Sequence, residues 1–323
     1  MAKVLLEITD LKVYYTRKVQ GKRFFKEKKH VKAVDGINFS VNEGETFGLV
    51  GESGCGKSTT GKAIVKLLTP TEGMIKFDGQ DVFTLHGIED KGYKRKAQII
   101  FQDPYSSLDP RFTVERIVGE PLVIHGMKSK KERREVVKKL LDDVGILPEY
   151  IRRHPHEFSG GQRQRIGVAR ALALNPSLVV CDEPVSALDV SIQAQILNLM
   201  KDLQEKYKLT YIFISHNLSV VKHVSDRIAV MYLGHIVEMA NTEDIFSNPL
   251  HPYTKALLDA VPEPDPDFVT DETPLQGDVP SPLNPPVGCC FHTRCPVAME
   301  ECSKVKPEMK EYEPGHTAAC HLL

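Results

Sequence analysis

The chain has 323 residues, which is enough for one large domain with a smaller appendage or for two domains. Its apolar fraction of 41% suits a globular protein, and a formal charge of −1 excludes an overall electrostatic attraction to nucleic acid or to a membrane surface. No apolar run approaches the roughly 20 residues that cross a bilayer. The first residues also lack a secretory segment, so we expect a cytosolic protein.

The N-terminal part predicts two strands joined by a basic connection. Residues 5–15 alternate partly and are rich in β-forming side chains, and residues 34–41 predict the second strand. Between them, residues 17–32 carry eight Lys or Arg side chains around Phe24 and Phe25. We interpret this stretch as the solvated tip of a hairpin, in preference to a contact with phospholipid headgroups or an acidic partner.

A phosphate-loop pattern, Gly, four residues, Gly-Lys and Ser or Thr, follows. The matching residues are Gly51, Glu52, Ser53, Gly54, Cys55, Gly56, Lys57 and Ser58. An apolar run at residues 46–50 predicts a buried strand before the loop, and residues 59–68 predict a helix after it. In that context the glycines let several N–H groups point at one phosphate, Lys57 reaches the β- and γ-phosphates, and Ser58 ligates Mg²⁺. The alternative is a glycine-rich turn that matches the pattern by chance. It would not explain why a strand precedes the loop and a helix follows it.

The next part of the chain changes from sheet to helix. Residues 73–77 and 97–101 predict strands, and Gln102 ends the second. From residue 103 to about residue 158, prolines break up short helical pieces. The clearest helix spans residues 130–144 and ends at Gly145. We interpret this part as a helical insertion rather than part of the sheet.

A second alternation of strands and helices then begins. Residues 178–181 form a continuous apolar run, typical of a parallel strand covered on both faces. Further strands are predicted at residues 210–215, 227–232 and 236–239, and helices at residues 190–208 and 217–224. The alternation predicts an α/β fold with a largely parallel sheet.

The composition changes again after residue 260. Eight prolines between residues 261 and 288 exclude a helix and predict an extended linker. Five of the seven cysteines follow residue 288. Clustered thiolates in a cytosolic protein indicate a metal site before a disulfide, and four of them are consistent with an iron–sulfur cluster. A zinc site with the same thiolates, or with His292 or His316, is the alternative, and free thiols are a further one.

Two more motifs narrow the function. Asp182 and Glu183 follow the buried run at residues 178–181, and they suit a Mg²⁺ ligand followed by a carboxylate that polarises an attacking water. Residues 159–162, Ser-Gly-Gly-Gln, stand at a predicted helix start, where free N–H groups form a second anion site. Because one nucleotide rarely needs two phosphate cradles from one chain, we expect this second cradle to serve ATP held by another subunit.

With these motifs, the chain resembles the ABC transporter ATPase family over nearly all of residues 4–260. The resemblance implies an α/β P-loop NTPase fold with a RecA-like core, an antiparallel β subdomain and a helical subdomain at about residues 103–165. It divides the chain into an ABC ATPase domain at residues 1–260, a Pro-rich linker at residues 261–288 and a Cys-rich C-terminal region at residues 289–323.

The family pattern assigns the chemistry to residues that end strands or begin the first helix. Ser58 and Asp182 are implied as Mg²⁺ ligands, and Gln102 as the residue that senses Mg²⁺ and water and faces the membrane subunit. Glu183 is implied as the catalytic base. His216 is implied as the contact to the γ-phosphate.

The same resemblance assigns the remaining nucleotide contacts. Tyr15 matches the aromatic residue that stacks on adenine, with neighbouring Tyr14 as the alternative, and Thr59 follows the Walker A loop. A second subunit is implied to complete each site with the LSGGQ stretch and the D-loop. The residues implied to act in trans are Ser159, Gly160, Gly161, Gln162 and Asp189.

The C-terminal part carries a narrower resemblance. Residues 251–254, the Pro-rich linker and the cysteine spacing resemble the C-terminal region of oligopeptide and dipeptide importer ATPases, most of all the second, F-type subunit. This implies a [4Fe–4S] cluster, with Cys290 spare. The implied ligands are Cys289, Cys295, Cys302 and Cys320, although the choice between Cys289 and Cys290 stays open. A structural role in the tail is favoured over redox sensing.

The expected function is ATP hydrolysis that drives uptake of dipeptides or oligopeptides. The resemblance implies two permease subunits, a sister ATPase, an extracytoplasmic solute-binding protein and a peripheral place on the cytoplasmic face of the inner membrane. Alternatives are the same role for another small solute such as nickel, a soluble ABC ATPase acting on ribosomes or DNA, and a regulatory module without hydrolysis. Glu183 and His216 argue against the last of these.

Overall fold

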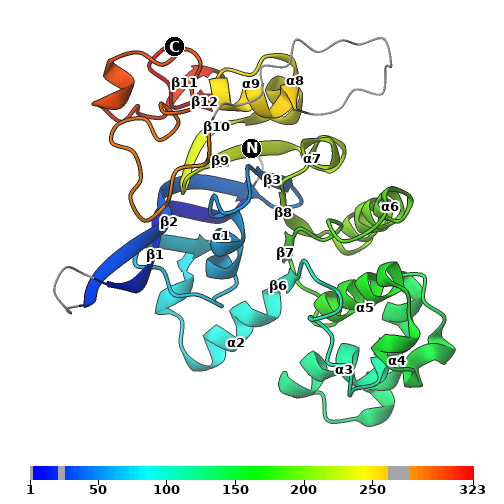
Figure 1. Ribbon diagram of the computed structural model, residues 1–323. Coiled ribbons are helices and arrows are strands. Elements are labelled where there is room, and N and C mark those ends of the chain that lie inside the picture. The colour runs from blue at the N-terminus through cyan, green and yellow to red at the C-terminus, as the bar shows by residue number, and fades with distance from the viewer. Residues whose placement is uncertain (1–2, 21–25, 261–276) are drawn as a thin grey trace, which may run out of the picture.

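The protein is built on two β-sheets with helices around them (Figure 1). The computed structural model describes residues 3–20, 26–260 and 277–323. The larger sheet has the spatial order β11-β12-β10-β9-β3-β8-β7-β6, and the smaller one has the order β2-β1-β4-β5. None of the helices within these described ranges is long and apolar enough to cross a membrane.

The centre of the larger sheet is parallel, as the sequence predicts. Its parallel strands are β6 (Ala97–Ile100), β7 (Leu178–Asp182), β8 (Thr210–Ser215), β3 (Thr46–Val50) and β9 (Arg227–Tyr232). Every residue of β3, β7 and β8 is buried, which explains why these strands are apolar except at their ends. The antiparallel strand β10 (His235–Asn241) continues the sheet beyond β9.

The smaller sheet is antiparallel and begins at the N-terminus. It consists of β1 (Val4–Gln20), β2 (Lys26–Asn42), β4 (Glu72–Phe77) and β5 (Gln80–Asp81). Both long strands extend further than predicted, because their backbone pairing continues through the basic stretch to Gln20 and Lys26. Phe24 and Phe25, at the predicted hairpin tip, lie outside the described residues.

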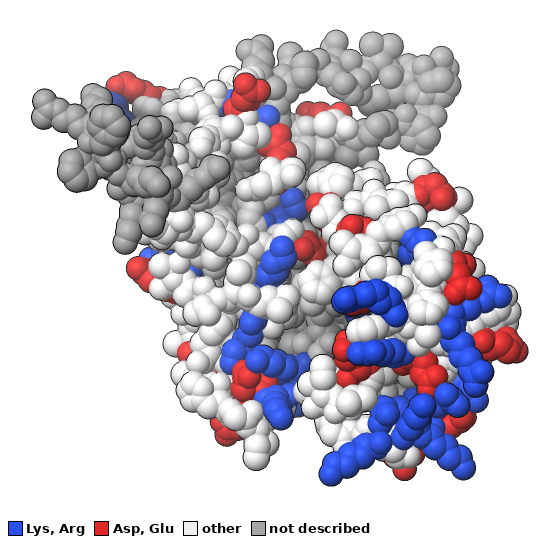
Figure 2. All heavy atoms as spheres, turned by 60° about the horizontal axis from the view of Figure 1, so that its bottom comes forward, with Lys and Arg blue, Asp and Glu red and all other residues white. Residues whose placement is uncertain are grey.

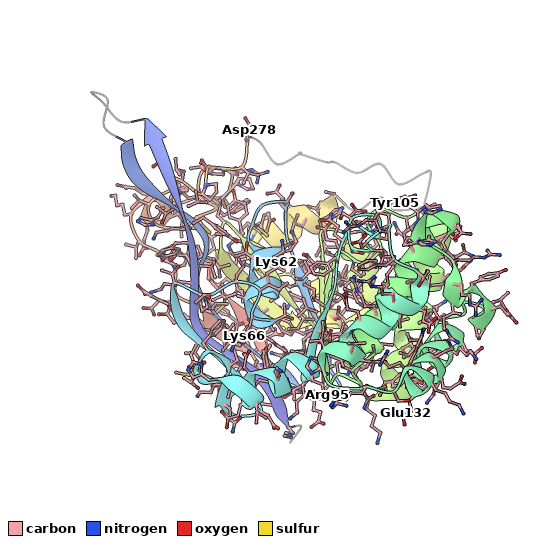
Figure 3. All side chains as sticks on the ribbon, turned by 90° about the horizontal axis from the view of Figure 1, so that it is seen from below. Lys62, Lys66, Arg95, Tyr105, Glu132 and Asp278 are labelled. Atoms are coloured by element: carbon pink, nitrogen blue, oxygen red, sulfur yellow. The ribbon has the colours of Figure 1, made fainter. Side chains whose placement is uncertain are left out.

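Helix α1 (Lys57–Ile64) follows the phosphate-loop pattern and packs against β7 and β8. The predicted extension of this helix to residue 68 is wrong. Lys66 adopts a left-handed backbone with φ 58°, and its ammonium group donates to the carbonyl oxygen of Val82 at 2.7 Å. Lys66, labelled in Figure 3, also pairs with Asp90 of α2 (Gly87–Lys96), a helix that was not predicted from the sequence.

The predicted helical insertion forms a separate group of helices beside the end of the sheet (Figure 1). It contains α3 (Val114–Ile124) and α4 (Lys130–Asp143), followed by short 3₁₀ turns. Helix α5 (Gly160–Leu172) begins after the predicted end of the insertion, near residue 158, and packs against α3 and α4. Helix α4 buries Val137, Leu140 and Leu141, as its periodicity predicts. Figure 2 shows Lys and Arg side chains gathered at this end of the molecule, and α4 alone contributes six of them.

The remaining helices follow strands of the larger sheet. They are α6 (Val190–Tyr207), α7 (Leu218–Val224), α8 (Thr242–Ser247) and α9 (Pro252–Asp259). Asn217 begins α7 by accepting hydrogen bonds from the N–H groups of Ser219 and Val220, which suits the short polar side chain at this position.

The C-terminal segment joins the larger sheet. Its strands β11 (Lys310–Glu313) and β12 (His316–Ala318) pair with each other, and β12 pairs with β10. Phe291 is fully buried against the rings of Tyr232 and Tyr253. Of the predicted linker, residues 261–276 lie outside the description, and the described residues 277–288 contain neither helix nor strand.

Candidate active site

The loop between β3 and α1 has a backbone that only glycine adopts easily. Gly51, Gly54 and Gly56 have φ values of 145°, 81° and 111°. A side-chain carbon on Gly51 would lie 2.1 Å from the carbonyl oxygen of Met231, and one on Gly56 would lie 2.2 Å from that of Ala33. The loop is therefore shaped both by its own turn and by close approach to β9 and β2.

Gly56→Ala is expected to unfold at a lower temperature than Gly54→Ala and to lose nucleotide binding. Both substitutions force alanine into the left-handed region, at a cost of about 1 to 2 kcal/mol. Only Gly56→Ala also drives a carbon into a backbone carbonyl, which adds about 2 kcal/mol. Gly54 has open space around the same position, so it is the matched control. Equal unfolding temperatures and equal nucleotide affinities would contradict this account.

Lys57 is buried at the base of the loop, with 4% of its surface exposed. Its ammonium group donates to the carbonyl oxygens of Gly51 at 2.7 Å and Glu52 at 2.9 Å. The Sγ atom of Cys55 lies 3.7 Å from the same nitrogen. This places a positive charge at the base of the phosphate loop, where a phosphate group would meet it.

Ser58, at the start of α1, contacts Asp182, at the end of β7. The Ser58 hydroxyl donates to an Asp182 carboxylate oxygen at 2.6 Å. Burial raises the pKa of Asp182, while the hydrogen bond from Ser58 and the charge of Lys62, labelled in Figure 3, act in the opposite direction. A hydroxyl and a carboxylate oxygen in contact fit the oxygen ligands that Mg²⁺ prefers.

The Glu183 carboxylate is contacted by two side chains that follow neighbouring strands. The Gln102 amide donates to Oε2 of Glu183 at 2.7 Å, and Nδ1 of His216 lies 3.1 Å from Oε1. Glu183 itself has a left-handed backbone with φ 48°, and its N–H donates to the carbonyl oxygen of Ile214 at 3.0 Å. The ends of β6, β7 and β8 thus hold the carboxylate from both sides.

These residues line one cleft of about 580 Å³. Its lining contains Thr59 and the phosphate loop except for Cys55, which is buried beneath the loop, and it also contains Gln102, Glu183 and His216. Asp182 contacts the cleft through Ser58. Two further lining residues, Ala33 of β2 and Leu257 of α9, were not anticipated, because nothing in their local sequence marks them as part of a phosphate site.

Comparison with known proteins identifies the family. A model of the ABC transporter family matches residues 34–186, and one of the oligopeptide/dipeptide transporter C-terminal region matches residues 237–302. The oligopeptide transport ATP-binding protein AppF of Bacillus subtilis is 53% identical, over 98% of this chain and 97% of its own length. The oligopeptide transport ATP-binding protein OppF of Escherichia coli is 52% identical, over 98% of this chain and 96% of its own length. The chain belongs to the ABC transporter family.

Solved structures of ABC ATPases share its P-loop fold. The ATP-binding cassette MJ0796, in a dimeric post-hydrolysis state bound to ADP and Pi, aligns with a TM-score of 0.64 and 29% identity. The alignment covers 74% of this chain and 99% of that one. The protein cbiO1 of Clostridium perfringens, part of the transporter complex cbiONQ, aligns with a TM-score of 0.64 and 26% identity, over 76% of this chain and 92% of its own.

The ABC-family residues expected to act in trans lie outside the cleft lining. The Ser159 hydroxyl accepts from the N–H of Gln162 at 3.3 Å and begins α5, and Asp189 begins α6 by accepting from the N–H of Ile192 at 3.0 Å. Gly161 faces Ile192 so closely that a side-chain carbon would lie 2.5 Å from Cγ2 of that residue. The start of α5 and the start of α6 are therefore packed together, and none of these residues lines this chain's own cleft.

Tyr15 and Tyr14 are distinguished by their surroundings. The Tyr14 hydroxyl donates to Asp35, and the Lys32 ammonium group lies 5.4 Å from the centre of its ring. Tyr15 is 43% exposed. Neither residue lines the cleft, and Tyr15 is the more exposed of the two.

The cysteines of the C-terminal segment lie close enough to influence one another. Burial raises the pKa values of the Cys289, Cys295 and Cys320 thiols. Neighbouring thiols, among them that of Cys302, raise these pKa values further. The Cys290 thiol lies 3.9 Å from the carbonyl oxygen of Tyr232, and burial together with the neighbouring Cys289 thiol raises its pKa to about 12. Within the parts of the chain that the structure covers, no three His, Cys, Asp or Glu side chains are arranged to hold a metal ion, so the expected cluster is not supported there.

Proposed function

We infer that this chain is the ATP-hydrolysing subunit of an ABC importer that takes up dipeptides or oligopeptides. The observation that carries the ATPase part is the cleft in which Lys57, the Ser58–Asp182 pair and Glu183 face one another. The importer part rests on the match to the oligopeptide/dipeptide transporter C-terminal region and on the near full-length similarity to AppF and OppF.

The residues of the cleft divide the work of phosphoryl transfer. Lys57 and the loop N–H groups bind the β- and γ-phosphates, and Ser58 and Asp182 would hold Mg²⁺, which neutralises phosphate charge. Glu183 accepts the proton of the attacking water. Gln102 and His216 fix the orientation of that carboxylate through their contacts at 2.7 and 3.1 Å. Residues 52–56 and Thr59 complete the cradle, and Tyr15 stacks on the adenine.

A second cassette completes each site in this proposal. The start of α5, with Ser159, Gly160, Gly161 and Gln162, offers backbone N–H groups and a hydroxyl to the γ-phosphate of ATP held by the partner, and Asp189 lies at the seam. Support comes from their position away from this chain's own cleft. MJ0796, which is similar in fold, is itself described as a dimer with ADP and Pi.

The domain division that goes with this function has three parts. Residues 1–260 form the ABC ATPase domain, with a RecA-like core, the antiparallel β1–β5 sheet and a helical subdomain at about residues 103–165. Residues 261–288 are a Pro-rich linker, and residues 289–323 form the Cys-rich region. Pairing of β12 with β10 implies that this last region docks on the ATPase sheet.

The experiment that tests the function is affinity purification of the chain from its native membrane. Two permease subunits, a sister ATPase and an extracytoplasmic solute-binding protein are expected to accompany it, on the cytoplasmic face of the inner membrane. A matched purification of the Lys57→Ala variant controls for assembly without nucleotide. Recovery with ribosomes or DNA and without permeases would favour a soluble ABC ATPase. Uptake of nickel instead of labelled dipeptides would identify nickel as the transported solute and would leave the proposed ATPase role unchanged.

We also propose that Cys289, Cys295, Cys302 and Cys320 hold a [4Fe–4S] cluster that fastens the tail. Support comes from the clustering of these cysteines in the tail, where burial and neighbouring thiols raise the pKa values of Cys289, Cys295 and Cys320. Because the described residues form no preassembled metal site, binding of the cluster would have to draw the four thiols together. Four thiolates are the ligand set such clusters need, and zinc is the alternative metal.

Metal analysis distinguishes a [4Fe–4S] cluster from a zinc site in the tail. Protein purified without oxygen is expected to contain iron and acid-labile sulfide, both lost in Cys302→Ser and retained in Cys290→Ser. Stoichiometric zinc without iron would contradict the cluster, and iron loss in Cys290→Ser with retention in Cys289→Ser would move the ligand to Cys290. Thermal unfolding of the same variants reports whether the metal stabilises the tail.

A further inference from the structure

The second residue of the phosphate loop, Glu52, is held by two residues of the C-terminal third of the chain. Its carboxylate oxygens accept from the two terminal guanidinium nitrogens of Arg294 at 2.7 and 3.1 Å. Its backbone N–H donates to the Tyr253 hydroxyl at 2.9 Å. Glu52 is thus fixed at both its main chain and its side chain from outside the loop.

The ion pair is shielded from water. The side chain of Arg294 is 6% exposed and that of Glu52 is 26% exposed. The two planar groups meet in the bidentate arrangement that gives both charge neutralisation and a fixed orientation. Removing one partner of a pair this buried leaves an uncompensated charge, whose cost exceeds the value of the contact itself.

Arg294 is itself anchored. The backbone N–H of Arg294 donates to the carbonyl oxygen of Phe291 at 3.0 Å, and the guanidinium carbon lies 5.9 Å from the centre of the Tyr232 ring. Phe291 packs against both Tyr232 and Tyr253, with ring centres 5.3 Å apart in each pair. The turn that carries Arg294 and the helix that carries Tyr253 therefore form one packed unit against β9.

This unit also reaches the cleft. Leu257, one helical turn beyond Tyr253 on α9, lines the same cavity as the phosphate loop. Glu52 is the one carboxylate within the loop sequence, and a free carboxylate there would repel a triphosphate. Pairing with Arg294 reduces that repulsion and directs the Glu52 carboxylate to a guanidinium group instead of to Lys57.

We propose that Arg294 and Tyr253 are positioning residues of the ATP site, through which the C-terminal region sets the affinity of the phosphate loop for ATP. The inference rests on the proposed function, because it requires ATP to bind in this cleft. The pair acts on Glu52 and the loop, and neither residue touches the reacting atoms.

The test is a double-substitution cycle on the full chain, with ATP affinity and hydrolysis kinetics as readouts. Arg294→Gln is expected to weaken ATP binding and raise KM by about tenfold, with kcat changed less than about threefold, because the loop is misplaced and the catalytic carboxylate is not. On a Glu52→Gln background, Arg294→Gln is expected to cost much less, since no carboxylate is left unpaired. Arg294→Lys should lie between Arg294→Gln and the wild type, and Tyr253→Phe should weaken binding by a few fold.

Controls separate this inference from the proposed site and from general loss of structure. Lys304→Gln breaks an exposed ion pair with Glu300 in the same segment and should leave ATP affinity unchanged. Lys57→Ala should abolish ATP binding, and if it does not, the proposed site itself is wrong. Unchanged affinity in Arg294→Gln, alongside loss in Lys57→Ala, overturns the inference alone. An equal loss of ATP affinity on adding Arg294→Gln to the wild type and to Glu52→Gln also overturns the inference. The effect of Arg294 would then not depend on the carboxylate of Glu52. If Arg294→Gln fails to fold, Arg294→Lys and Tyr253→Phe carry the same comparison.

Discussion

Replacing Glu183 with glutamine is expected to lower ATP hydrolysis by about two to four orders of magnitude while ATP still binds. The amide keeps the size of the carboxylate but does not accept the proton of the attacking water. The phosphate loop, Lys57 and the Ser58–Asp182 pair are left intact, so the nucleotide is retained. Steady-state and single-turnover hydrolysis, measured beside equilibrium ATP binding, separate the two effects.

A sister cassette in the same assembly would mask this loss if its own site works alone. The measurement is therefore made also with the equivalent carboxylate of the sister chain replaced. Glu132→Gln, on the exposed face of α4, changes the same chemical group far from the cleft and should hydrolyse ATP normally. Hydrolysis at the wild-type rate in the doubly substituted assembly would remove Glu183 from its catalytic role.

Each predictable part of the site directly follows a predicted strand in the sequence. The loop at residues 51–58 requires a strand before it and a helix after it, and β3 and α1 supply them. Asp182 and Glu183 end β7, and His216 follows β8. Since these strands are parallel neighbours, their carboxyl ends must meet at one edge of the sheet. Local pattern and sheet topology together were sufficient for this half of the cleft.

The parts that were not predictable depend on contacts across long stretches of chain. Arg294 and Glu52 are 242 residues apart, and an arginine in a cysteine-rich tail carries no signal that it will reach a phosphate loop. Leu257 lies on α9, a short helix that begins with Pro252 and has no extended periodicity. The early end of α1 at Ile64 was missed for a related reason. The contact of Lys66 with Val82 is tertiary, and it overrides a favourable local helical pattern.

Gly160→Asp is expected to abolish hydrolysis at the site completed by this chain, while the chain's own ATP affinity stays within about twofold of the wild type. In the proposed dimer, the N-terminus of α5 faces the partner's γ-phosphate. A carboxylate there opposes the charge that the helix start would stabilise, and loss of comparable stabilisation costs about 100-fold or more in rate. If the partner is a sister chain, a Glu183→Gln background isolates the affected site, because the remaining hydrolysis is then of the sister's ATP.

The structure supplies a matched control for this substitution. A side-chain carbon on Gly160 would meet only Cδ2 of Leu188 at 3.5 Å, an ordinary contact, so Gly160→Ala should fold and retain most activity. Gly161 is unsuitable for the test, because Ile192 already occupies the space beside it and any added side chain would displace the start of α6. If Gly160→Asp weakened ATP binding in the lone chain as much as Lys57→Ala does, the second cradle would act within one molecule. The two-cassette arrangement would then lose its physical basis.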